Sequence, residues 1–82
     1  MGNNKEEVRY KLEALLAELQ RLRDEIRVRI HLGGMDLRDQ WKEFEPRIEE
    51  IVQQQKQKAT EELCNAAADL RDAFRAFRDK LS

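Results

Sequence analysis

The sequence is poor in the residues that build sheets, disulfides and membrane spans. Its 82 residues include one cysteine, one proline and three glycines, and aromatic side chains make up 6% of the chain. A single cysteine excludes an internal disulfide, so we expect a reducing, cytoplasmic location. The scarcity of glycine, proline and aromatic residues argues against a sheet protein. The longest apolar run, Ala14 to Ala17, is far too short for a transmembrane helix.

The chain also lacks a large net charge of either sign. The chain carries 16 basic and 17 acidic residues, which give a net charge of −1. No overall field therefore attracts nucleic acid or an anionic lipid surface. Charged residues nevertheless make up 40% of the chain, a composition typical of long amphipathic helices with a thin core. We expect one helical domain over residues 1–82, and chains this small often complete their core by self-association.

Residues for catalysis or metal binding are equally scarce. The only histidine is His31 and the only cysteine is Cys64, whereas a zinc site commonly needs several ligands of these types. Val28 precedes His31 by three residues, so the Glu-x-x-His spacing of di-iron bundles is absent. No glycine-rich phosphate loop is present either. The sequence therefore predicts no enzyme, no metal and no cofactor.

The first half of the chain has helical periodicity. Apolar residues recur at alternating intervals of four and three from residue 8 onward: Val8, Leu12, Leu15, Leu19, Leu22 and Ile26. This spacing is a coiled-coil seam and predicts a helix over about 5–32.

Residues 25–32, EIRVRIHL, alternate apolar and polar side chains as a half-buried strand would. No other segment offers a partner strand, so we favour a helix that ends at a Gly-Gly corner over 33–35. Gly33 stands where a left-handed helix cap is expected. Val28, Leu32 and Met35 then form a second apolar stripe, which we expect to be wedged into the corner.

The second half predicts a long helix over about 36–81, for which Asp36 is a plausible cap. Pro46 should kink it, because proline removes a hydrogen bond and clashes with the preceding turn. The polar segment 53–60 contains no glycine or proline to end a helix, although Thr60 could cap a new one. A break at 53–60 therefore stays open.

Helix lengths favour a particular assembly. A helix over 36–81 is about 69 Å long and the first helix about 42 Å, which leaves an apolar overhang of about 27 Å. We therefore predict an antiparallel helical hairpin that dimerises into a four-helix bundle. A break near 53–60 would instead give a monomeric three-helix bundle. The predicted interface residues are Trp41, Phe44, Leu63, Leu70, Phe74, Phe77 and Leu81.

These features together predict a non-catalytic oligomerisation or protein-interaction module, most simply a homodimer, with an unidentified protein as a further possible partner. One alternative is a helical dimer that binds nucleic acid through the basic residues Arg21, Arg23, Arg27 and Arg29. Acidic residues interrupt this cluster, whereas binding faces concentrate positive charge. A second alternative is an amphipathic segment over 70–81 that lies on a lipid surface. We expect neither nucleic acid nor a membrane as the partner.

Overall fold

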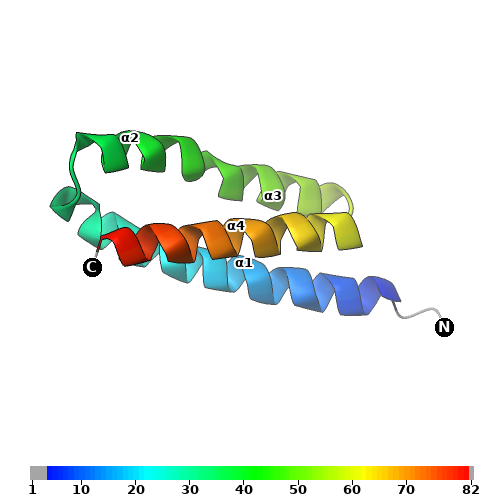
Figure 1. The fold of residues 1–82 in the computed structure, drawn as a ribbon. Helices are drawn as coiled ribbons and strands as arrows, with labels where there is room; N and C mark the ends of the chain where they lie inside the picture. Colours follow the sequence, from blue (N-terminus) through cyan, green and yellow to red (C-terminus); the bar gives the residue numbers. More distant parts are fainter. Residues whose placement is uncertain (1–3, 82) are drawn as a thin grey trace.

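The computed structural model describes residues 4–81, and every regular element in this range is helical (Figure 1). The helices are α1 (Asn4–Arg29), α2 (Met35–Phe44), α3 (Pro46–Gln57) and α4 (Glu61–Lys80), and a short 3-10 helix, η1 (Ile30–Leu32), follows α1. The predicted all-α class is thus confirmed, and the alternating segment 25–32 is helical rather than a strand.

The apolar seam of α1 forms one side of the core. Val8, Leu12, Leu19, Leu22 and Ile26 are all buried. Leu16 is buried beside them, while Leu15 is half-buried against the same cluster. The interval of three and four residues keeps these side chains on one face of the helix, as the sequence predicted.

The Gly33-Gly34 corner differs from its prediction. Neither glycine is left-handed, because Gly33 has φ −84° and Gly34 has φ −74°. Gly33 instead allows close packing: a Cβ atom there would lie 2.9 Å from Leu81 Cδ2 and 3.1 Å from Leu37 Cβ. Gly34 has open space around it and caps α2, whereas the expected cap, Asp36, lies inside the first turn.

Pro46 bends the second helical segment as predicted. It occupies the first turn of α3, where its missing N–H is not needed, and Glu45 joins the two helices in a right-handed helical conformation. The backbone of Glu45 still donates a hydrogen bond to the Trp41 carbonyl, at 2.9 Å. The apolar face therefore continues across the bend.

The prediction of one long second helix is wrong. α3 ends at Gln57, Lys58 is extended with φ −163° and ψ 122°, and Thr60 begins α4. The Thr60 hydroxyl accepts a hydrogen bond from the backbone N–H of Leu63 at 3.1 Å, which makes it a true N-cap. Ala59 packs against the core at this break. The chain thus reverses and adopts the alternative arrangement, a three-helix bundle.

The reversal places α4 alongside α1, with the bent α2–α3 segment covering both (Figure 1). The molecule is an elongated rod with extents of 49 × 19 × 15 Å. Its C-terminal end lies beside the Gly33 corner, as the contact between Gly33 and Leu81 requires. One continuous apolar core runs along the axis.

The two glycines of the corner should respond in opposite ways to the same substitution. Gly33→Ser should lower the free energy of unfolding by about 2 kcal/mol, because Leu37 and Leu81 must move to admit a side chain. Gly34→Ser should raise it by about 0.5 kcal/mol, through a better helix cap and a less flexible unfolded chain. Urea unfolding of both variants measures the difference, and equal losses would contradict the assigned role of Gly33.

Candidate functional site

The residues predicted to form a dimer interface lie in the core of a single chain. Trp41, Leu63, Leu70, Phe74, Phe77 and Leu81 are buried, and Phe44 is half-buried. Trp41 contacts Phe74 edge-on with ring centroids 5.0 Å apart, and it stacks on Phe77 at 5.7 Å. Phe44 completes this four-ring cluster from its edge, where the Arg47 guanidinium lies 5.4 Å from its ring centroid. These residues leave no bare stripe for a second copy, so the reason for placing an interface there is removed.

The four basic residues of the nucleic-acid alternative do not gather into a basic patch. Arg27 pairs with Glu45, and this hydrogen bond and the carboxylate charge raise the pKa of Arg27. Arg23 is half-buried and lies 3.8 Å from the carboxylate of Asp24. Arg21 and Arg29 are exposed. A phosphate backbone would therefore meet paired and separated charges rather than a concentrated field.

The arginines of α4 are also paired with acidic residues. Arg71 and Arg75 both pair with Glu18 on α1, and the Arg78 guanidinium donates to Glu25 at 3.3 Å. These ion pairs link α1 to α4 along one side of the bundle. Since the pairs are partly exposed, each contributes little to stability but helps to fix the register of the two helices.

The remaining candidates for chemistry are isolated. His31 is exposed in the last turn before the corner, and its carbonyl accepts a hydrogen bond from Arg38. The buried Cys64 thiol donates to the Val8 carbonyl at 3.4 Å, and burial raises its pKa. Within residues 4–81, no three His, Cys, Asp or Glu side chains are grouped to hold a metal ion. None of the described helices is long and apolar enough to cross a membrane.

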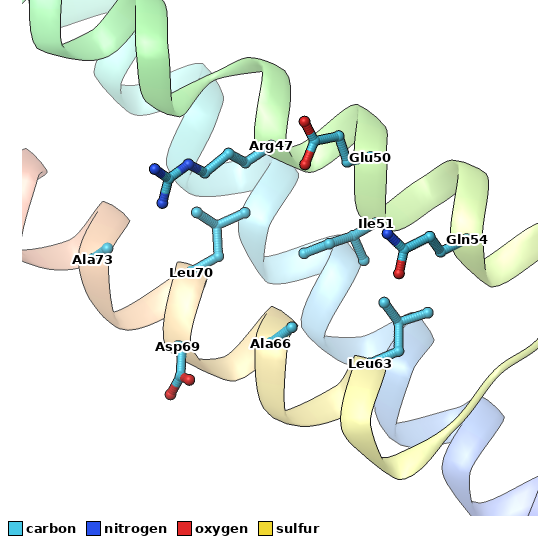
Figure 2. A pocket seen from close by; sticks show the side chains of 9 residues that line it. All are labelled: Arg47, Glu50, Ile51, Gln54, Leu63, Ala66, Asp69, Leu70 and Ala73. Atoms are coloured by element: carbon cyan, nitrogen blue, oxygen red, sulfur yellow. The ribbon is translucent and has the colours of Figure 1, made fainter.

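A shallow groove runs between α3 and α4 (Figure 2). Ile51 of α3 and Leu63 of α4 point toward one another across it, and its volume is about 350 Å³. Arg47, Glu50 and Gln54 border it on the α3 side. Because the apolar side chains at its base are already buried, this groove offers a ligand little apolar surface.

Large apolar side chains are exposed on α1 and at the corner. Four large apolar side chains are exposed: Tyr10 (73%), Val28 (70%), Leu32 (68%) and Met35 (78%). The stripe formed by Val28, Leu32 and Met35 was expected to be wedged into the corner, but it faces solvent. The spacing of the stripe is visible in the sequence. The sequence does not show which side of α1 the other helices leave uncovered.

Comparison with known proteins finds no match to a family model, a curated protein or a solved structure.

The buried thiol of Cys64 predicts how stability depends on pH. A pKa raised by burial means that the folded state favours the protonated thiol. This stabilisation is complete below the ordinary value of 9.0 and is lost as the pH rises above it, because the unfolded chain then releases the proton more readily. The free energy of unfolding should therefore fall more steeply between neutral pH and about pH 10 in the wild type than in Cys64→Ala. Parallel slopes in the two proteins would contradict this.

Proposed function

We propose that this chain is a non-catalytic helical module that self-associates through the outer face of α1. We define the outer face as the exposed α1 residues Tyr10, Ala14, Ala17, Arg21, Asp24 and Val28, together with Leu32 and Met35 at the corner. The observation that supports this is the exposure of four large apolar side chains, Tyr10 and Val28 on α1 and Leu32 and Met35 at the corner that follows it. Apolar side chains that gather in a patch mark contact surfaces on soluble proteins, and Val28, Leu32 and Met35 lie within eight residues of one another.

This proposal moves the dimer contact from α4 to α1. The aromatic side chains of α4 are satisfied within one chain, since Phe74 and Phe77 pack against Trp41 and Phe44. The module therefore keeps a closed core and uses its spare apolar surface for association. A net charge of −1 adds little repulsion between two copies. A single buried thiol suits a reducing, cytoplasmic setting.

The two alternative functions have weaker support. Nucleic-acid binding would need a cluster of free arginines, but Arg27 pairs with Glu45, and Arg71, Arg75 and Arg78 pair with carboxylates of α1. Lipid binding by residues 70–81 would first have to remove buried side chains such as Phe74 from the core.

Val28→Glu tests the proposed function. It replaces an exposed apolar side chain at one end of the outer face with a charge, so self-association should weaken while the fold persists. Light-scattering mass after size exclusion should exceed the 9.8 kDa of one chain for the wild type and rise with concentration. The variant should stay near the single-chain mass with an unchanged thermal melting curve.

Gln53→Glu is the matched control, because it adds the same charge at an exposed position of α3. It should associate like the wild type. A wild-type mass of one chain at every concentration would contradict self-association. An unchanged mass for Val28→Glu would show that the outer face is not the contact.

A further inference from the structure

The outer face of α1 has the spacing of a second helix-pairing seam. Its residues from Tyr10 to Val28 follow one another at intervals of four, three, four, three and four, and all six are exposed. This heptad spacing aligns their side chains along one line of the helix. The line lies opposite the buried seam that begins at Val8 and ends at Ile26. α1 therefore has one seam for its own bundle and a second that no described helix covers.

The flank of the outer face that lies toward α4 is hollowed. Ala14 and Ala17 are small, and they border a depression of about 710 Å³ between α1 and α4. The ion-paired side chains Glu18, Glu25 and Arg78 stand around it. Large apolar side chains lie toward the two ends of the face, Tyr10 at one end and Val28 with Leu32 at the other. The face thus offers the small residues Ala14 and Ala17 between Tyr10 and the charged centre, and large apolar residues beyond that centre.

Opposite charges flank the centre of the face. Arg21 and Asp24 are both exposed and stand three residues apart on the seam. Arg21 forms no ion pair with any residue among 4–81, unlike the arginines of α4. Asp24 has its neighbour Arg23 at 3.8 Å and its charge also acts on Arg27, but its side chain is 71% exposed. Both charges are available to a partner.

We propose that a second copy of the chain packs antiparallel on this face, about a two-fold axis that passes between Leu22 and Arg23. The proposal rests on the self-association proposed above and specifies its geometry. In this register, Arg21 faces Asp24 of the second copy, and the symmetry repeats the pair. Ala17 faces Val28 of the second copy, so a small residue receives a large one. Tyr10 is directed toward the Leu32 and Met35 corner of the second copy.

The charge pattern selects the antiparallel orientation. A parallel pairing in register would place Arg21 against Arg21 and Asp24 against Asp24, and like charges across a helix pair oppose association. It would also set Ala17 against Ala17 and leave the depression unfilled. A two-fold axis perpendicular to α1 removes both defects, and the same surface of both copies still makes the contact. Exposed ion pairs add little affinity, but they fix orientation and register.

A charge exchange tests the register. Arg21→Glu should weaken dimerisation by about tenfold or more, because two attractive contacts become two repulsions. Asp24→Arg should weaken it similarly. The double variant, Arg21→Glu with Asp24→Arg, should recover the wild-type dimerisation constant, as measured by sedimentation equilibrium. A double variant as weak as the single ones, alongside a dimeric wild type, would overturn the register and leave self-association intact.

Disulfide formation tests the same geometry independently of charge. In a Cys64→Ala background, the variants Ala17→Cys and Val28→Cys are mixed and oxidised mildly. The antiparallel register predicts a mixed 17–28 disulfide. It separates the two copies of residue 17 by about 16 Å along the helix, beyond disulfide reach. A predominant 17–17 product would indicate parallel pairing and overturn the proposal.

The outcomes separate the two proposals. A wild type that is monomeric at every concentration removes the proposed function and, with it, this geometry. A wild type that dimerises but gives no 17–28 disulfide removes the geometry alone. Gln20→Cys, on α1 beside the outer face, is the background control and should form no predominant product with Val28→Cys.

Discussion

Phe74 and Phe77 of α4 meet Trp41 and Phe44 of α2 in a four-ring cluster, in which ring centroids lie between 5.0 and 6.4 Å apart. These four rings are most of the aromatic side chains that the chain possesses. Their burial is the constraint on which the rest of the structure depends, because a stripe of this kind does not stay bare in water. The chain buries these rings against its own residues by reversing direction at Lys58–Thr60.

Once α4 is folded back, the other features of the bundle have clear roles. Because Gly33 has no side chain, Leu81 and Leu37 can approach the corner, and the C-terminal end of α4 packs there. The ion pairs that Arg71, Arg75 and Arg78 make with α1 help to fix the register of α1 and α4. α1 is then covered on its inner side alone. Its outer side keeps apolar side chains in water, which is the basis of the proposed self-association.

Strong local patterns in the sequence predicted their elements well. The seam from Val8 to Ile26, the bend at Pro46 and the Thr60 cap all follow from side-chain spacing or backbone chemistry. The break before Thr60 was underestimated, because residues 53–60 contain good helix formers and the gain from burying the α4 stripe is a tertiary effect. The space around Gly33 was equally invisible, since it depends on Leu81, far along the chain. For the same reason, sequence alone could not show which side of α1 stays exposed.

The distance between the two ends of the α2–α4 segment tests the central claim most directly. Spin labels on Asp36→Cys and Lys80→Cys, in a Cys64→Ala background, report this distance by pulsed electron paramagnetic resonance. Dilution with unlabelled protein restricts the signal to a single chain. The folded-back bundle predicts a short distance, because Leu81 lies against the Gly33 corner. A distance near the ~69 Å of an unbroken helix over 36–81 would contradict the intramolecular closure of the core.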